Sequence, residues 1–269
     1  APNAGPRKAW AAGDATSRAV RLAMLVLKGE IGYPSALSAP TWGFYDVSFQ
    51  GKPFQFQRPY GTYVMENVLF KISYPAEFHA QTAVEAAVAL HPEVLPRLQE
   101  VDKVVLTTHE SAIRIISKTG ALNNPADRDH CLQYMVAVGL LKGDLVAADY
   151  EDSVASDSRL DRIRESMVVE EDVRFSEEYH QPEKRSIANA VQVFFRDGTA
   201  TEKVTVEYPL GHRRRRKEGI PLLEDKFRRN LSARFPAPHA NEIETLCMDQ
   251  DALESTPVDE FMGLLVVPS

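Results

Sequence analysis

Apolar residues recur at helical spacing near both ends of the chain. One such stretch runs from Asp14 or Thr16, either of which can cap a helix, to Gly29. A second begins at Pro221 and continues toward the C-terminus. The positions that predict a buried face are Val20, Ala23, Met24 and Leu27 in the first stretch and Leu222, Phe227 and Leu231 in the second. We therefore expect helical segments at both ends of the chain.

The middle of the chain carries the pattern of strands. Residues 101–108 are rich in β-branched residues, and residues 168–175 are a further candidate strand. Residues 187–195 and 202–208 flank Asp197-Gly198, which is a strong signal for a hairpin turn. Together these segments predict an α+β unit with an antiparallel sheet, inserted between the helical segments of the two ends.

Two helices are predicted among these strands. The first is rich in alanine and begins near His79 or Ala80. The second spans residues 131–141 and has Asp127 or Asp129 as its cap. Tyr134 lies on or beside the apolar face of this second helix. A buried tyrosine with a satisfied hydroxyl is the common meaning of such a position, and a catalytic tyrosine is the alternative.

Composition argues against several classes of function. A net charge of -7 over 269 residues argues against a general binder of polyanions. The two cysteines are too few to hold a cubane iron–sulfur cluster, and they suit a reducing compartment. The seven histidines form no zinc-binding pair, and the sequence has no Walker loop, dinucleotide fingerprint or nucleophile elbow. No apolar run is long enough to span a membrane. We expect no metal, no cofactor and no membrane partner.

Several polar side chains lie just before the predicted alanine-rich helix, within residues 70–87, FKISYPAEFHAQTAVEAA. Lys71, Glu77 and His79 supply a cation, a carboxylate and an imidazole within nine positions. Pro75 bars a regular helix and favours extended geometry at Tyr74, so we expect Lys71 on a loop or strand end. A cation ahead of a helix N-terminus is a plausible place to hold an anionic substrate. The alternative is an ordinary connection with three solvated polar residues.

A basic run, Arg213 to Lys217, follows directly after Gly211-His212. The planar fork of arginine suits the carboxylates of a small polyacid. Binding of phosphates or a nucleic-acid backbone is a second interpretation, and a solvated loop is a third. Lys8 lies just ahead of the first predicted helix, where a solvated surface lysine is the ordinary interpretation.

Five long segments carry a resemblance that covers essentially the whole chain. They are GPRKAWAAGDATSRAVRLA, GFYDVSFQGKPF, PYGTYVMENVLFKISYPAEFHAQTAVEAA, LNNPADRDHCLQYMVA and VEYPLGHRRRRKEGIPLLEDKFRRNL. Together they resemble the C-terminal part of the MmgE/PrpD family, whose full chains carry a further N-terminal helical region. The chain also begins without a methionine or the apolar core of a signal peptide. We therefore expect a fragment of a longer protein.

The resemblance implies a fold and a chemistry. Family members join a large all-helical domain to a smaller α+β lid domain. That would place residues 1–72 in the helical domain, 73–212 in the lid and 213–269 in the return to the helical domain. Family members act on small di- and tricarboxylates without an iron–sulfur cluster. They dehydrate 2-methylcitrate, decarboxylate cis-aconitate or epimerise iminodisuccinate.

The expected reaction is the removal of water from 2-methylcitrate to give 2-methyl-cis-aconitate in propionate breakdown. Decarboxylation, isomerisation or hydration of a related tricarboxylate is the first alternative, and a non-catalytic or nucleic-acid-binding module is a third hypothesis that we favour less. The resemblance further implies a homodimer, with no nucleic-acid partner. The expected compartment is the cytoplasm, or the mitochondrion in a eukaryote.

The resemblance also implies site residues. Lys8 falls on a family active-site lysine, and Lys71 falls on the lysine that precedes the Tyr-Pro motif, with one extra residue between. His79 or Glu77 takes the place of a histidine that relatives carry shortly after the proline. Tyr134 falls on a family active-site tyrosine. The family's aspartate and histidine from the N-terminal helical region have no counterpart, so we expect this chain alone to be nearly inactive.

Dehydration requires a base for a proton alpha to a carboxylate, an acid for the departing hydroxide and cations for the developing charge. Lys8 and Lys71 are the candidate cations. His79 or Tyr134 is the candidate for proton transfer, with base and acid left unassigned. Three further residues are candidates for binding substrate, namely Glu77, His212 and Arg213.

Overall fold

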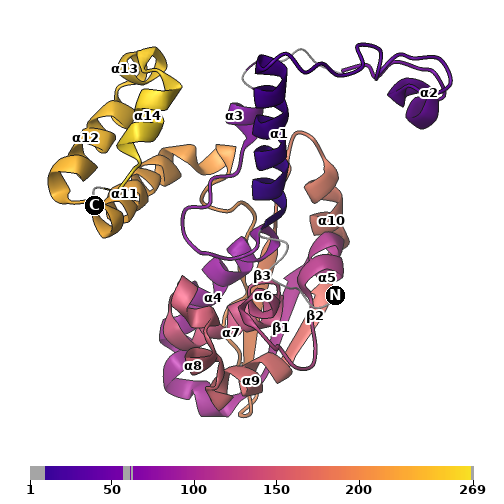
Figure 1. Ribbon diagram of the computed structural model, residues 1–269. Helices are drawn as coiled ribbons and strands as arrows, with labels where there is room; N and C mark the ends of the chain where they lie inside the picture. The colour runs from indigo at the N-terminus through magenta and orange to yellow at the C-terminus, as the bar shows by residue number, and fades with distance from the viewer. Residues whose placement is uncertain (1–9, 57–60, 62, 268–269) are drawn as a thin grey trace. The chain divides into compact units, whose positions relative to one another are not determined.

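The computed structural model describes residues 10–56, 61 and 63–267. Contacts divide the chain into two compact units, one ending at Glu66 and the other beginning at Asn67. The helices of the first unit are α1 (Ala11–Leu27) and α2 (Phe44–Phe49), while α3 (Tyr63–Asn67) spans the boundary (Figure 1). Lys8 lies outside the described residues.

The predicted N-terminal helix is confirmed as α1, but its details differ from the prediction. The helix begins at Ala11, so Asp14 and Thr16 lie inside it and neither caps it. The predicted buried face is wrong for this structure: no residue of α1 is buried, and Leu27 is 80% exposed.

The second unit is built around one four-stranded sheet in the order β2-β1-β3-β4. The strands are β1 (Val101–Thr108), β2 (Met167–Glu171), β3 (Asn189–Phe195) and β4 (Val204–Val206). Strand β3 pairs antiparallel with β1 and β4, whereas β1 and β2 are parallel. The parallel pair exists because several helices connect β1 to β2, and such a crossover returns the chain in the same direction. The predicted α+β class is confirmed, with a mixed and mainly antiparallel sheet.

The predicted hairpin turn between β3 and β4 is confirmed at Asp197-Gly198. Gly198 has φ of 86°, a left-handed conformation that glycine adopts without strain. The Asp197 carboxylate accepts the backbone N–H of Thr199 at 2.9 Å and the Thr199 hydroxyl at 2.6 Å. These bonds close the turn locally, which is why the sequence alone predicts it.

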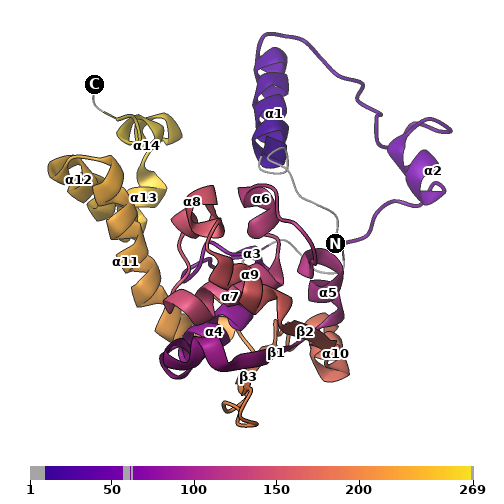
Figure 2. The same cartoon turned by 90° about the horizontal axis from the view of Figure 1, so that it is seen from below.

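One face of the sheet carries the main hydrophobic core. Helices α4 (Gln81–Val94), α7 (Leu132–Lys142) and α9 (Ser158–Glu165) gather on this side of the strands (Figures 1 and 2). Every residue of α7 from Leu132 to Leu141 is buried. Helix α4 can lie close to α7 because Gly139 has no side chain: a Cβ there would lie 3.0 Å from the Cβ of Ala87. Glycine and alanine therefore set the spacing of the two helices.

A smaller cluster forms where Phe175 of α10 (Val173–His180) packs on Ala188 and Ala190. The predicted strand over 168–175 is therefore only partly right. Strand β2 stops at Glu171 because the Asp172 carboxylate accepts the Arg174 N–H at 2.9 Å and caps α10. The remaining short helices of this unit are η2 (Phe78–Ala80), η3 (Leu95–Glu100), α5 (Glu110–Ile116), α6 (Pro125–Arg128), η4 (Ala147–Tyr150), α8 (Asp152–Ala155) and η5 (Arg213–Arg215).

The chain ends in four helices, as the apolar spacing after Pro221 predicts. They are α11 (Arg216–Arg234), α12 (Ala237–Met248), α13 (Gln250–Ser255) and α14 (Val258–Leu264). Leu231 is buried against Ala240 and Ile243, and Phe227 packs against them, but Leu222 is 45% exposed. No helix in the described part of the chain is long and apolar enough to cross a membrane.

Candidate active site

The turn ahead of α4 is held by the segment's own polar groups. The amide of Gln81 donates to the carbonyls of Tyr74 at 2.8 Å and Ala76 at 3.0 Å, which fixes the chain on either side of Pro75. The Glu77 carboxylate accepts the backbone N–H of His79 at 2.8 Å and so caps η2. The predicted helix start near His79 or Ala80 is confirmed. The hydrogen bonds described above hold the side chains of Gln81 and Glu77 in place.

Glu77, His79 and Tyr179 form one chain of hydrogen bonds. Nδ1 of His79 lies 2.8 Å from Oε2 and 2.9 Å from Oε1 of Glu77, and Nε2 lies 3.2 Å from the Tyr179 hydroxyl. Because a carboxylate only accepts, Nδ1 carries the hydrogen of the neutral ring and Nε2 is left as the basic nitrogen. Burial acts to raise the pKa of Glu77, but its bonds from His79 outweigh burial and hold that pKa below its usual value. The carboxylate is therefore ionised at neutral pH.

His109 packs against both rings of this cluster. Its ring is stacked on Tyr179 with centroids 4.7 Å apart, and its centroid lies 5.2 Å from that of His79. His109 is fully buried, and neither ring nitrogen has a hydrogen-bond partner among the described residues. Burial, with the nearby His79, lowers the pKa of His109 to about 4. His109 is thus a neutral, rigid surface against which His79 and Tyr179 are placed.

Asn189 at the start of β3 ties this cluster to the sheet. Its Nδ2 donates to the His79 carbonyl at 2.8 Å and to the Thr82 hydroxyl at 2.7 Å. The Thr82 hydroxyl in turn donates to the Ile187 carbonyl at 2.5 Å. The backbone of His79 is therefore anchored to buried Asn189 of the sheet, while its ring is oriented by Glu77.

Lys71 and Tyr134, two further predicted catalytic residues, lie outside this chain of hydrogen bonds. Lys71 is exposed, with Nζ 5.1 Å above the ring of Phe78. Tyr134 is 2% exposed, and its hydroxyl donates to the Asp149 carbonyl at 2.6 Å. Burial raises the pKa of Tyr134 to about 12. Tyr134 also lines a pocket of about 320 Å³ together with Arg128 and Arg164.

His212 and Arg213 have structural contacts in this chain. His212 is buried, packs on the ring of Tyr208 and accepts the backbone N–H of Arg214 at 3.2 Å, so it caps η5. Burial, with the neighbouring arginines, lowers the pKa of His212 to about 4. Arg213 donates to the Asn67 side chain and to the Glu183 carbonyl, each at 3.1 Å.

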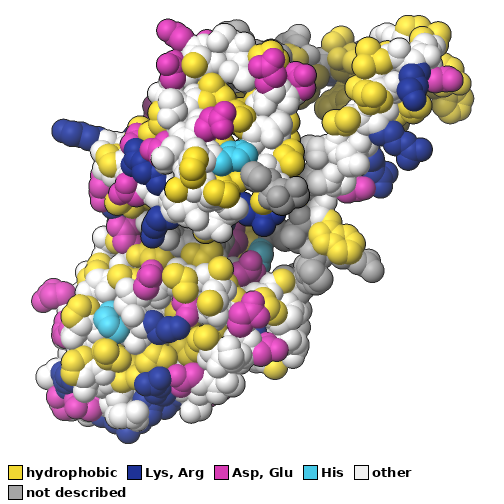
Figure 3. All heavy atoms as spheres, turned by 60° about the vertical axis from the view of Figure 1, so that its left-hand side comes forward, with side chains coloured by type: hydrophobic (Ala, Val, Ile, Leu, Met, Phe, Trp, Pro, Cys, Tyr) yellow, Lys and Arg dark blue, Asp and Glu magenta, His cyan; other side chains and the backbone are white. Residues whose placement is uncertain are grey.

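Three further arginines of the basic run also make contacts within the chain. Arg214 donates to the Glu183 carbonyl at 2.9 Å, Arg215 forms ion pairs with Glu85 and Glu218, and Arg216 donates to the Val68 carbonyl at 3.2 Å. On the face shown in Figure 3, Lys and Arg side chains are interspersed with Asp and Glu side chains. The basic run therefore ties neighbouring segments of the chain together.

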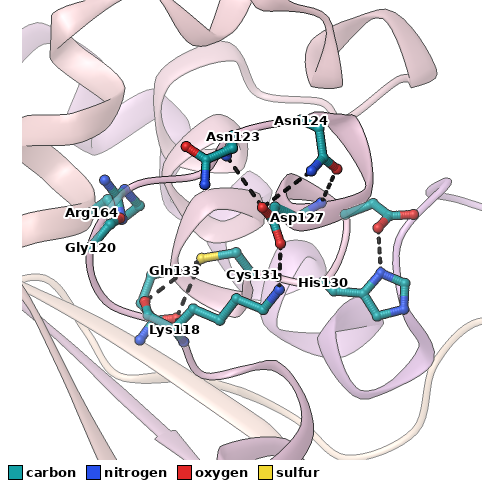
Figure 4. Close-up of polar contacts among 10 residues, drawn as sticks. Lys118, Gly120, Asn123, Asn124, Asp127, His130, Cys131, Gln133 and Arg164 are labelled. Atoms are coloured by element: carbon teal, nitrogen blue, oxygen red, sulfur yellow. Dashed lines mark hydrogen bonds and ion pairs between the residues drawn. The ribbon is translucent and has the colours of Figure 1, made fainter. Parts of the chain in front are cut away.

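A buried ion pair stabilises the loop in front of α7. Nζ of Lys118 lies 3.2 Å from Oδ1 of Asp127, with side chains 3% and 1% exposed (Figure 4). The other Asp127 oxygen accepts the Asn123 N–H and the Asn124 amide, each at 3.3 Å. Asp127 or Asp129 was predicted to cap α7, and both alternatives are wrong. Asn124 caps α6, the Asp127 carboxylate pairs with Lys118, Asp129 ends α6, and Cys131 is the N-cap residue of α7 without a side-chain bond.

Sequence patterns did not single out Tyr179, His109 or Asn189 as site residues. Tyr179 is 100 residues from His79 in the chain, and Asn189 is 110 residues away. Only the fold brings them together; His109 carries a weak signal as the polar residue that closes β1. Among the described residues, no group of three or more His, Cys, Asp or Glu side chains is arranged to hold a metal ion.

Comparison with known proteins identifies relatives along nearly the whole chain. The family model described as MmgE/PrpD C-terminal domain matches residues 74–250, and the model described as MmgE/PrpD N-terminal domain matches residues 1–57. The 2-methylcitrate dehydratase of Escherichia coli (strain K12) is 60% identical over 99% of this chain and 56% of its own length.

Two relatives from other organisms show similar identity and coverage. The 2-methylcitrate dehydratase of Cupriavidus necator is 58% identical over 99% of this chain and 56% of its own. The protein named 2-methylcitrate dehydratase, mitochondrial, of Yarrowia lipolytica is 56% identical over 99% of this chain and 51% of its own. The chain spans about half the length of the curated relatives it matches.

Proposed function

Because the chain belongs to the MmgE/PrpD family, we propose that the intact protein is a hydro-lyase that converts 2-methylcitrate into 2-methyl-cis-aconitate and water. The observation that carries the proposal is the 56–60% identity, over 99% of this chain, to relatives named 2-methylcitrate dehydratase. The reaction is iron–sulfur independent in this proposal. The α+β region acts as the lid domain, and the chain's two ends belong to the helical domain.

The Glu77–His79–Tyr179 cluster supports the proton-transfer part of this proposal. In the elimination, the C–H bond alpha to a carboxylate breaks, its electrons form the double bond, and the C–O bond breaks to release hydroxide. A base takes the carbon proton, and an acid gives the proton that turns hydroxide into water. His79 suits either role, because Glu77 fixes its tautomer and stabilises the charged ring when Nε2 gains a proton.

Cations hold the substrate carboxylates and stabilise the charge of the enolate-like transition state. Lys71 suits this task because its ammonium group is exposed and has no carboxylate partner among the described residues. Lys8 remains a candidate by its place in the sequence. Arg213 is a weaker candidate for this task, because it already donates to the Asn67 side chain. Tyr134 is a weaker candidate for proton transfer and His212 for substrate binding, because each already makes a contact within the chain.

A mass-resolved assay on the intact protein tests the proposal. We expect 2-methyl-cis-aconitate to form from 2-methylcitrate at the same rate with and without an iron chelator. Product from cis-aconitate or citrate alone would favour the second candidate, a decarboxylase or dehydratase of a related tricarboxylate. Activity abolished by the chelator would contradict the cofactor-free mechanism. The cytoplasmic or mitochondrial compartment and a homodimeric state are part of the same proposal.

A further inference from the structure

Tyr179 belongs to the hydrogen-bonded cluster, but the mechanism above assigns it no role. Helix α10 carries Tyr179 on the same face as Phe175, four residues earlier, which is buried against Ala188 and Ala190. The Ser176 hydroxyl of the same helix accepts the backbone N–H of Glu110 at 2.8 Å. The position of Tyr179 is therefore fixed by packing and by a bond between two helices.

The direction of the hydrogen bond between Tyr179 and His79 follows from the place of Glu77. Both oxygens of the Glu77 carboxylate lie within 2.9 Å of Nδ1 of His79, so Nδ1 carries the ring hydrogen and Nε2 is an acceptor. The Tyr179 hydroxyl, 3.2 Å from Nε2, therefore donates to that nitrogen. In the neutral cluster, the basic lone pair of His79 is occupied by this hydroxyl.

The rest of the His79 ring is largely covered by the protein. The side chains of His79 and Glu77 are only 12% and 17% exposed, and fully buried His109 packs against the His79 ring. Tyr179 is half-buried beside exposed His180, and its hydroxyl oxygen accepts no hydrogen bond from any described residue. A substrate atom would have to displace the Tyr179 hydroxyl to reach Nε2, whereas the hydroxyl oxygen itself has lone pairs to offer.

We propose that Tyr179 is a catalytic residue whose hydroxyl transfers the proton between the substrate and Nε2 of His79, an inference that rests on the proposed dehydration. When this relay acts as the base, the substrate C–H bond breaks and its electrons form the double bond. The released proton bonds to the Tyr179 oxygen while the Tyr179 O–H proton moves to Nε2. The relay then holds a neutral phenol and an imidazolium ring beside the ionised Glu77 carboxylate, which stabilises the new charge.

The same relay serves as the acid when it runs in the opposite direction. The proton on Nε2 returns to the Tyr179 oxygen as Tyr179 gives its own proton to the departing hydroxide, which becomes water. The stack on His109 suits both directions, because His109 is neutral above a pKa of about 4 and places no positive charge against the phenol. Tyr179 thus keeps the hydrogen that the relay must move.

The kinetics of the intact protein with Tyr179→Phe test the relay. Phenylalanine keeps the ring that stacks on His109 and removes only the hydroxyl. We expect kcat for dehydration of 2-methylcitrate to fall at least about 10²-fold, the lower end of the usual contribution of proton transfer, with little change in KM. An unchanged kcat would overturn the proposal.

Tyr208→Phe is the matched control. Tyr208 also packs on a buried histidine, with its ring centroid 4.6 Å from that of His212, but its hydroxyl bonds no imidazole among the described residues. We expect its kcat to equal that of the unchanged protein. A loss as large as that of Tyr179→Phe would overturn the proposal, because removal of any packed hydroxyl would then have the same effect.

A second variant separates proton transfer from packing. Replacing Tyr179 with 3,5-difluorotyrosine keeps both the ring and the hydroxyl but makes the phenol a stronger acid. Because the relay requires the neutral phenol, the basic limb of the pH–rate profile should move to lower pH. An unchanged profile would show that Tyr179 only packs or positions His79, and would overturn the proposal even where Tyr179→Phe is inactive.

The comparison also distinguishes failure of the relay from failure of the proposed reaction. Equal turnover of 2-methylcitrate by the unchanged protein and by Tyr179→Phe would reject the relay alone. No turnover of 2-methylcitrate by the unchanged protein would reject the proposed reaction, and the same pair of proteins acting on cis-aconitate or citrate would then decide the relay. No turnover of any of the three compounds would reject both.

Discussion

The ion pair between Lys118 and Asp127 gives a quantitative test of the buried polar cluster in front of α7. The change Asp127→Asn keeps the size of the side chain and removes its charge, so Lys118 is left charged and 3% exposed. Removing one partner of a buried pair costs about 3–5 kcal/mol, because the remaining charge stays desolvated. With a urea slope of about 2 kcal/mol/M, the unfolding midpoint should fall by roughly 1.5–2.5 M.

Glu110→Gln is the matched control for this experiment. The pair between Arg114 and Glu110 is long, at 3.5 Å, and its side chains are 78% and 46% exposed. Such a surface pair contributes at most about 0.5 kcal/mol. A fall of less than about 1 kcal/mol for Asp127→Asn, with an unchanged slope, would refute the buried pair. The double change Lys118→Met with Asp127→Leu should recover most of the loss.

Three further predictions follow from the packing and the site. The His109 pKa of about 4 lies below the unfolded value of about 6.5, so the unfolded chain binds the extra proton first and stability falls as pH drops from 6.5 toward 4. Between pH 7 and pH 4.5, the free energy of unfolding measured with urea should fall by about 2.5 kcal/mol less in His109→Phe than in the unchanged chain. An equal fall in both proteins would contradict the low pKa of His109. Gly139→Ala should cost about 1–3 kcal/mol in urea unfolding, because its Cβ would press on Ala87, whereas Gly263→Ala, with nothing within 4 Å, should cost nothing. Tyr179→Phe should shift the ¹⁵N signal of His79 Nε2 and leave Nδ1 protonated; an unchanged Nε2 signal would contradict the hydrogen bond.

Local chemistry explains the parts of the fold that the sequence predicted well. Strand β1 occupies residues 101–108 as predicted, because its β-branched residues fit a half-buried strand. The hairpin at Asp197-Gly198 and the start of helix α4 depend on bonds between residues close in sequence. Burial pattern and turn chemistry agree at these places, so one sequence is enough to find them.

Long-range contacts explain what the sequence could not predict. Asp127 looks like a helix cap by type and position, yet its carboxylate bonds Lys118 nine residues earlier. Phe175 looked like the end of a strand, but the Asp172 cap turns the chain into α10. In the candidate site, Glu77 and His79 are sequence neighbours and could be predicted together. Tyr179 joins them only through the pairing of distant strands and helices.

The most direct test of the account is the rate of 2-methylcitrate dehydration by the intact protein with His79 changed to Gln. Glutamine keeps a polar side chain of similar length but cannot transfer a proton at neutral pH. Equal urea midpoints for both proteins would show that the fold is retained. We expect the formation of 2-methyl-cis-aconitate to slow by about 10²–10⁴-fold, the usual contribution of a general acid or base. A rate equal to that of the unchanged protein would contradict the assignment of proton transfer to His79.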